Sequence, residues 1–464
     1  MAGLLSKERT VAAAGYNRWL IPPCALATHL CIGQVYALSV FNLPLTRQLG
    51  VDHSSPNDWK LTQLGWIFTI AIVALGISAA VFGKWVQEQG PRKSGFVAAL
   101  CWGLGFLVGA LGIQNHQLWL IYLGYGVLGG CGLGIGYITP VSTLIAWFPD
   151  RRGMATGMAI MGFGGGALIA SPLSVQLMKH FASATSTGIA ETWVVLGALY
   201  LLFMLGGAFG YRVPPPNFAP AGWSAPAPKP RELITRSNVA PSEAIRTRQF
   251  WLLWVVLCFN VTAGIGVLSQ ASAMIQELFK GRINASAAAG FVGLLGLFNL
   301  LGRFLWASLS DKVGRKATYA CFFTLGPLLY ALVPVAGKSG SVTFFVSCAV
   351  IILTMYGGGF ATIPAYLADI FGPKYVSAVH GRLLTAWSAA GVLGPVLVNY
   401  VREFQIEHGV PKYQAYNATM YIMVALLAVA FFANLAVTPV SDKHVEHTPT
   451  DPRQGSRTPA TVHG

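Results

Sequence analysis

Long apolar runs separated by short polar segments are the dominant pattern along this chain. A helix needs about 20 predominantly apolar residues to cross the hydrocarbon core of a bilayer. Twelve runs meet this requirement, at 19–43, 61–86, 94–113, 117–147, 153–180, 192–211, 250–276, 287–309, 318–336, 342–370, 377–401 and 416–437. The pattern therefore predicts an all-α polytopic membrane protein with twelve transmembrane helices.

The twelve runs form two groups of six, 19–211 and 249–438, on either side of a polar segment at 212–248. This segment begins PPPNFAPAGWSAPAPKP after Arg212-Val213, and its proline density and basic residues are typical of a linker rather than of a folded domain. Residues 1–18 are predicted to be a short polar N-terminus. The polar residues 439–464, rich in Thr, Pro and His, are predicted to be a disordered tail.

The second group of runs repeats landmarks of the first at a constant offset of 224 residues. Four pairs share this offset: Gly90 with Gly314, Pro140 with Pro364, Pro149 with Pro373, and Gly157 with Gly381. Such agreement indicates an internal duplication. Parallel six-helix repeats place a solute site near the membrane midplane, between the halves, and work by rocking of one half against the other.

Composition and charge support a membrane location and argue against nucleic-acid binding. The chain is 54% hydrophobic and only 10% charged, with a mean hydropathy of +0.57. If the N-terminus is cytoplasmic, 22 of the 31 Lys and Arg residues fall on the cytoplasmic side and 8 on the other. This asymmetry follows the positive-inside rule and predicts that both termini are cytoplasmic. The net charge of +15 is thus explained by basic residues on the cytoplasmic side of the membrane rather than by nucleic-acid binding.

The sequence shows no arrangement of residues typical of a catalytic site or of a site for a resident cofactor. All seven cysteines lie inside apolar runs without a CxxC pair, so no metal site is predicted. No nucleophile–base cluster and no phosphate-binding P-loop is recognisable, so neither an enzyme nor an ATP-driven pump is expected. No cofactor is predicted.

Arg303 is the only charged residue in the stretch GFVGLLGLFNLLGRFLW at 290–306. An arginine within a membrane helix costs about 2.5–3.5 kcal/mol on insertion scales and therefore faces a cavity or a partner. The next acid on this helix, Asp311, is eight residues away, or roughly 12 Å along the axis. Arg303 therefore predicts an anionic ligand. The alternative is an ion pair with an acid on another helix.

Two loops that follow the second and the eighth run carry related charged motifs. Residues 83–93 read GKWVQEQGPRK, with Gly90, Arg92 and Lys93, and residues 308–316 read SLSDKVGRK, with Asp311, Gly314, Arg315 and Lys316. They resemble the G-x-x-x-D-[RK]-x-G-R-[RK] signature of the major facilitator superfamily, which implies the major facilitator fold. The resemblance implies a cytoplasmic latch that holds one conformer; plain topological charge is the alternative. The first copy lacks the acid and has Gln87 in its place.

A narrower resemblance, to the oxalate/formate antiporter family, covers most of the first eleven runs. It is carried by 17–23 (NRWLIPP), 29–41 (HLCIGQVYALSVF), 132–140 (GLGIGYITP), 148–157 (FPDRRGMATG) and 380–391 (HGRLLTAWSAAG). The resemblance implies a bacterial inner-membrane carrier of small carboxylates, with Arg303 as the carboxylate ligand. One departure matters: the family's oxalate exchanger has a lysine where this chain has Trp387. One buried cation suits one carboxylate.

Several other side chains are candidates for the substrate site. Asn299, one turn before Arg303, either orients the guanidinium, binds a substrate hydroxyl, or bonds to another helix. The remaining candidates are hydroxyl donors, polar cavity groups and an apolar wall, each with helix packing as the alternative: Tyr137, Tyr356, Gln34, Gln270 and Trp387. His29 is the candidate for proton coupling, because no acid lies deep in a run; a histidine bonded between helices is its alternative.

We therefore expect a monomeric secondary active transporter of small monocarboxylates such as lactate, pyruvate, glycolate or formate. Its partners would be the carboxylate anion, the lipid bilayer and, in a symporter, H⁺. Alternating access would proceed by proton symport or by anion exchange, and the sequence leaves both open. The alternatives are an oxalate/formate-type dicarboxylate exchanger and, from a different class, a carboxylate sensor with a transporter fold.

Overall fold

The computed structural model describes residues 3–51, 53–216, 218–223, 233–235 and 237–446. Within these residues, twelve helices are long and apolar enough to cross a membrane. The predicted all-α class with twelve spans is therefore confirmed. In the described part, β-pairing is limited to isolated bridges, which pair Val11 with Val213, Ser183 with Ser186, and Val239 with Val445.

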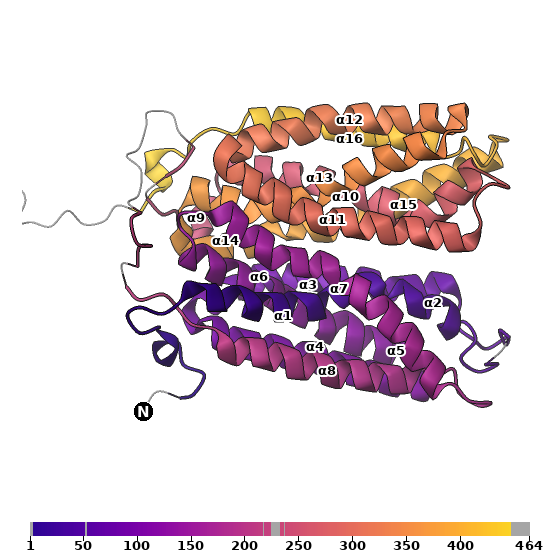
Figure 1. Ribbon diagram of the computed structural model, residues 1–464, viewed down its shortest axis with the longest axis horizontal. Coiled ribbons are helices and arrows are strands. Elements are labelled where there is room, and N and C mark those ends of the chain that lie inside the picture. The colour runs from indigo at the N-terminus through magenta and orange to yellow at the C-terminus, as the bar shows by residue number, and fades with distance from the viewer. Residues whose placement is uncertain (1–2, 52, 217, 224–232, 236, 447–464) are drawn as a thin grey trace, which may run out of the picture.

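The first six spans form one bundle, drawn from indigo to magenta in Figure 1. Two of its spans are not regular α-helices throughout: the first contains a 3₁₀ turn, and the fourth contains a π-helical segment. The elements are α1 (Ile21–Ile32), η3 (Gly33–Ala37), α2 (Ser39–Leu45), α3 (Leu61–Gln89), α4 (Pro91–Gln114), α5 (Leu118–Ile121), η4 (Tyr122–Gly129), α6 (Gly130–Trp147), α7 (Arg152–Phe181) and α8 (Ile189–Gly210).

The last six spans form the second bundle, drawn from red to yellow. Its eleventh span is interrupted at Leu384, between α14 and α15. The elements are α10 (Arg248–Leu278), α11 (Ala285–Val313), α12 (Arg315–Ser339), α13 (Val342–Phe371), η5 (Pro373–Tyr375), α14 (Val376–Leu383), α15 (Thr385–Glu407) and α16 (Asn417–Leu435). Short helices outside the bundles are η1 (Glu8–Thr10), η2 (Arg18–Leu20), α9 (Pro241–Ala244) and η6 (Asp442–His444).

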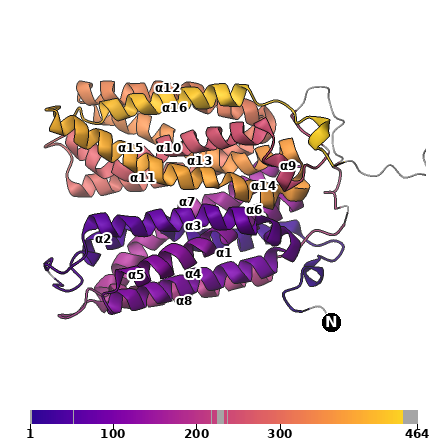
Figure 2. The same ribbon diagram turned by 180° about the vertical axis from the view of Figure 1, so that it is seen from behind.

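The two bundles pack side by side, with α3 and α7 of the first facing α11, α13, α14 and α15 of the second (Figures 1 and 2). The helices approach closely because small residues lie between them. A Cβ on Gly153 would lie 2.1 Å from the carbonyl oxygen of Ala307, and a Cβ on Gly381 would lie 2.0 Å from that of Ala79. Gly157 and Gly381, which the sequence pairs at the 224-residue offset, both lie at this interface.

The described parts of the N-terminal segment, the linker and the C-terminal segment gather at one end of the bundles (Figure 1). We call this the linker end, and the opposite end, with the loop residues 46–51, 53–60 and 408–416, the far end. At the linker end, Val239 N–H donates to the carbonyl of Phe371 at 2.9 Å. The linker is therefore attached to the second bundle at the last residue of α13.

The tail that the sequence predicts to be disordered begins at residue 439. Its first eight residues, 439–446, are described by the structure and make specific contacts. Residues 442–444 form η6, and Val445 pairs with Val239 of the linker. The Glu446 carboxylate accepts hydrogen bonds from Lys374 Nζ at 2.8 Å and from the Tyr375 hydroxyl at 2.6 Å. These contacts with the linker and with η5 order a polar segment that has no apolar periodicity of its own. Residues 447–464 lie outside the described part.

Candidate functional site

The Arg303 side chain is fully buried on α11, at the interface between the two bundles. Its Nε donates to Asn299 Oδ1 at 3.2 Å, and its Nη1 donates to the carbonyl of Ile160 on α7 at 3.4 Å. Asn299 lies one helical turn away and therefore shares a face with Arg303. Within the described residues, Nη2 has no hydrogen-bond partner and no acidic side chain pairs with the guanidinium.

Two phenylalanines, one from each bundle, lie close to this guanidinium. Its central carbon is 5.8 Å from the ring centroid of Phe163 on α7 and 5.3 Å from that of Phe360 on α13. Cation–π attraction of this kind is strongest where water is excluded, and it stabilises a cation without neutralising it. The site therefore keeps its positive charge.

Further aromatic and imidazole rings surround these groups, and together with Arg303 we call them the central cluster. Trp387 is fully buried on α15, with its ring centroid 4.6 Å from that of Phe360 and 5.3 Å from those of Phe163 and Tyr137. The central cluster consists of Arg303, His29, Tyr36, Tyr137, Phe163, Tyr356, Phe360, His380 and Trp387, which come from six spans of both bundles.

The two predicted tyrosines make different contacts in the central cluster. Tyr137, on α6, is fully buried, and its hydroxyl has no hydrogen-bond partner within the described residues. Tyr356, on α13, has its hydroxyl 3.4 Å from that of Tyr36 in η3, which makes a contact across the two bundles. Of the two tyrosines, Tyr137 has the hydroxyl that is not hydrogen-bonded within the described residues, whereas the Tyr356 hydroxyl connects the two bundles.

His29 lies beside Tyr137, with the two rings stacked at 5.3 Å. Its Nδ1 is 2.7 Å from the carbonyl oxygen of Ala159, and its Nε2 is 3.2 Å from that of Tyr137. A neutral imidazole can donate to only one of the two carbonyls, whereas an imidazolium donates to both. The geometry is that of a histidine bonded between helices α1, α6 and α7.

Two of the predicted substrate-site residues make their contacts elsewhere. Gln34 accepts a hydrogen bond from the Tyr125 hydroxyl at 3.0 Å, inside the first bundle. Gln270 donates to Asn399 at 2.6 Å, between α10 and α15. Both amides are polar groups in membrane helices that bond to a neighbouring helix of the same bundle. Within the described contacts, neither amide bonds to a member of the central cluster, and their part in the substrate site stays a prediction.

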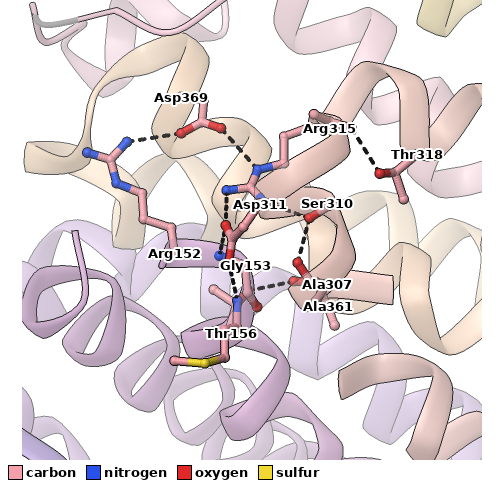
Figure 3. Close-up of polar contacts among 12 residues, drawn as sticks. Arg152, Gly153, Thr156, Ala307, Ser310, Asp311, Arg315, Thr318, Ala361 and Asp369 are labelled. Carbon is pink, nitrogen blue, oxygen red and sulfur yellow. Dashed lines mark hydrogen bonds and ion pairs between the residues drawn. The ribbon is translucent and has the colours of Figure 1, made fainter. Parts of the chain in front are cut away.

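The second loop motif forms a network across the bundles at the linker end, shown in Figure 3. The Asp311 carboxylate accepts from the backbone N–H groups of Gly153 and Met154, each at 2.8 Å. These are the second and third residues of α7, whose first amides are unpaired within the helix and whose dipole favours a negative charge. One acid of the second bundle thus caps a helix of the first.

Asp369 continues this network, since it pairs with arginines of both bundles. Its Oδ1 is 3.0 Å from Nη1 of Arg152 on α7, and its Oδ2 is 3.0 Å from Nε of Arg315 on α12. Arg315 also pairs with Asp311 at 2.6 Å. In addition, the Thr156 hydroxyl donates to the carbonyl of Ala361 at 2.7 Å. We call the set Arg152, Gly153, Met154, Asp311, Arg315 and Asp369 the charged latch.

The other residues predicted for the latch do not bridge the bundles in the described contacts. Arg92 donates to the carbonyls of Leu4 and Phe209, and Lys93 donates to Gln89. Lys316 caps the carboxyl end of α16 through the carbonyls of Leu435 and Val437. Gly90 and Gly314 adopt φ values of +82° and +93° where α3 and α11 end, so both are needed for the chain reversal. The first motif lacks a bridging acid because Gln87 is uncharged.

Eight residues of the central cluster and the charged latch were not predicted as site residues: Tyr36, Phe163, Phe360, His380, Arg152, Gly153, Met154 and Asp369. A signal for the two phenylalanines exists in the sequence, since each is an aromatic residue next to glycines, in Gly162-Phe163-Gly164 and Gly359-Phe360. For Asp369, an acid at the end of a span, nothing in the sequence indicates that its partners come from two other helices.

Comparison with known proteins places the chain in a family. The model of the Major Facilitator Superfamily matches residues 24–395 and also 271–461. The oxalate:formate antiporter of Oxalobacter formigenes is 29% identical over 383 residues, which cover 82% of this chain and 83% of the antiporter. Apicoplast pyruvate carrier 1 of Toxoplasma gondii is 23% identical over 437 residues, which cover 84% of this chain and 78% of the carrier.

The fold agrees with this placement. The crystal structure of the Escherichia coli fucose:proton symporter superposes with a TM-score of 0.63 at 13% sequence identity, covering 91% of this chain and 98% of the symporter. The predicted resemblance to the superfamily is thereby confirmed, as is the expectation that the chain is not an enzyme. The chain belongs to the Major Facilitator Superfamily and is an integral, multi-pass membrane transporter.

Proposed function

We propose that this protein carries small monocarboxylates across the membrane by alternating access, with Arg303 as the anchor for the carboxylate. The observation that carries the proposal is the fully buried guanidinium whose Nη2 has no partner within the described residues. A buried, unpaired cation is costly, and a bound carboxylate would neutralise it and accept its free N–H group. The names of the relatives, an oxalate:formate antiporter and a pyruvate carrier, support an anionic substrate.

A single carboxylate fits the site better than two. The resemblance to the oxalate/formate antiporter family implies a lysine in its oxalate exchanger where this chain has Trp387, which is fully buried among Phe163, Phe360 and Tyr137. A second carboxylate at this position would lose its hydration and gain only an indole N–H in return. Substrates with one negative charge, such as lactate, pyruvate, glycolate or formate, leave the loaded site neutral, which favours its reorientation.

The charged latch supplies one of the two states that alternating access requires. Its cross-bundle contacts, from Asp311 to α7 and from Asp369 to Arg152, exist only while the bundles are close at the linker end. Rocking the bundles apart at this end would break them. We propose that the described conformer is the one closed at the linker end and that substrate binding lowers the barrier between the two states.

Coupling is either proton symport or anion exchange, and His29 is the residue through which a proton would act. Its two ring nitrogens face carbonyls of α6 and α7. Gain or loss of a proton would therefore change how α1 is bonded to both helices. Symport predicts uptake driven by an inward proton gradient alone, and exchange predicts uptake only into vesicles that contain a second anion.

We also propose that both termini are cytoplasmic, in the inner membrane of a bacterium, and that the carrier works as a monomer. The 22 to 8 asymmetry of Lys and Arg supports this orientation. Fusions of green fluorescent protein and of alkaline phosphatase to the C-terminus test it. A fluorescent, phosphatase-inactive result is expected, and the opposite result would reverse the topology.

The test of the substrate is uptake of radiolabelled L-lactate, pyruvate, formate and oxalate into proteoliposomes, with and without a pH gradient. Arg303→Ala and Arg303→Lys are compared with the matched control Arg246→Gln, which removes an exposed arginine that pairs with Glu243. We expect monocarboxylate uptake that is lost in both Arg303 variants and retained in the control. Uptake that survives Arg303→Ala would remove Arg303 from the site, and oxalate uptake driven only by counter-anion would identify a dicarboxylate exchanger instead.

A further inference from the structure

His380 is another buried polar residue of the central cluster. It is not among the hydrogen-bond partners of Arg303 in the described contacts. It lies on α14 with 1% of its surface exposed, and its Nε2 has no hydrogen-bond partner within the described residues. Its ring centroid is 5.8 Å from that of Tyr137. The Tyr137 ring is in turn 5.5 Å from Phe163, one of the two rings beside the Arg303 guanidinium.

Other buried polar groups of the central cluster also lack a hydrogen-bond partner within the described residues. Four buried polar atoms of the central cluster are unpartnered within the described residues: Arg303 Nη2, Tyr137 OH, His380 Nε2 and Trp387 Nε1. Buried polar groups in native proteins are nearly always hydrogen-bonded, so a concentration of exceptions at one place indicates a ligand that supplies the partners. Since Tyr137 belongs to the first bundle and the other three belong to the second, the ligand would contact both.

The four groups differ in what they can bind. Arg303 and the indole N–H of Trp387 only donate, and the arginine carries a full charge that selects a carboxylate. A neutral imidazole has one donor and one acceptor nitrogen, and the tyrosine hydroxyl both donates and accepts. His380 and Tyr137 can therefore bond to a hydroxyl group or to a keto oxygen, neither of which needs a compensating charge.

We propose that His380 is a specificity-determining residue that binds the hydroxyl or keto oxygen of a short monocarboxylate whose carboxylate is held by Arg303. This inference rests on the proposed function and narrows its substrate class to hydroxy- and oxo-monocarboxylates. Formate and unsubstituted fatty acids would leave His380 and Tyr137 without a partner. A site built to hydrogen-bond a polar group rejects an analogue that lacks it, because the buried partners stay unpaired.

The test compares L-lactate and pyruvate with propionate, which has the same number of carbons but no hydroxyl or keto group. Their inhibition constants are measured against radiolabelled substrate in proteoliposomes. The wild type is expected to prefer lactate and pyruvate roughly 10- to 100-fold, the range expected when one buried partner loses its hydrogen bond. His380→Phe, which keeps a ring of similar size, should lose this preference by weakening lactate and pyruvate alone, with propionate unchanged. His380→Gln, whose amide reaches a similar position, should restore part of the preference.

The outcomes separate this inference from the proposed function. If the wild type transports lactate and propionate equally well, and Arg303→Ala abolishes both, the proposed function stands and the role of His380 is overturned. If His380→Phe weakens all three acids to the same extent, His380 is structural and the inference fails. If no monocarboxylate is transported, the proposed function itself fails. Should His380→Phe not fold, the wild-type preference and the His380→Gln variant still decide the question.

Discussion

Replacing Asp311 by asparagine is expected to open the linker end. Asp311 accepts from two amides of α7 at 2.8 Å, and these bonds cross the bundles. Its pairing with Arg315 at 2.6 Å lies within the second bundle and persists in either conformer, so it cancels from the difference between them. Only the two amide bonds distinguish the closed state from the open one at this residue.

The magnitude follows from the charge on the acceptor. A hydrogen bond to a charged group contributes about 1.5–3 kcal/mol, and one between neutral groups about 0.5–1.5 kcal/mol. An asparagine oxygen can still accept one of the two amides, now as a neutral bond, while its NH₂ group cannot accept the other. The closed state should therefore lose about 3 kcal/mol, or roughly a 100-fold change in the ratio of the two states. A protein that is 99:1 closed would become roughly half open.

The assay is the distance between spin labels on opposite bundles, measured by pulsed electron resonance in a background whose seven native cysteines are replaced and whose uptake is first verified. Exposed Lys84 and Lys312 report on the linker end, and exposed Lys179 and Lys280 report on the far end. In Asp311→Asn the first distance should lengthen and the second should shorten. The matched control Glu243→Gln removes an acid of the same end that pairs with Arg246 in the linker. Identical distributions in Asp311→Asn and wild type would refute the reasoning.

Three further predictions address the interface, the substrate charge and the effect of pH. Gly153→Ala should also open the linker end in the same distance measurement, because its Cβ would lie 2.1 Å from the carbonyl oxygen of Ala307. Trp387→Lys should raise oxalate counterflow and lower lactate uptake roughly tenfold, because a second buried cation needs a second negative charge; unchanged selectivity in proteoliposomes would contradict this. Burial raises the pKa of Asp150, but hydrogen bonds from Arg18 at 2.6 and 3.0 Å outweigh it and hold this pKa below its usual 3.8. The stabilising effect of Asp150 is thus present above the usual pKa and lost as pH falls through the lower value. The Tm difference in detergent between wild type and Asp150→Asn should shrink below about pH 4.

The number of spans could be read from the sequence alone, which also indicated a duplication and singled out Arg303 as an isolated charge in an apolar helix. These features are readable because a bilayer imposes a fixed length of apolar residues and makes an isolated charge conspicuous. The orientation of Arg303 by Asn299 was also predictable, since residues four apart on a helix share a face. Asp311 was identified from its motif, although the amides that it caps were not.

Which polar residues meet depends on how the helices pack against one another. Gln34, Gln270 and His29 look alike in sequence, as single polar residues in apolar runs. All three bond within their own bundles in the described contacts, but only His29 does so beside Tyr137 of the central cluster. Asp369 similarly acquires partners from α7 and α12. Periodicity fixes which side chains share a helix face, but which faces meet depends on how twelve helices pack together. That packing brought His380, Tyr137 and Trp387 into the same cluster as Arg303, and no local pattern along the chain encodes it.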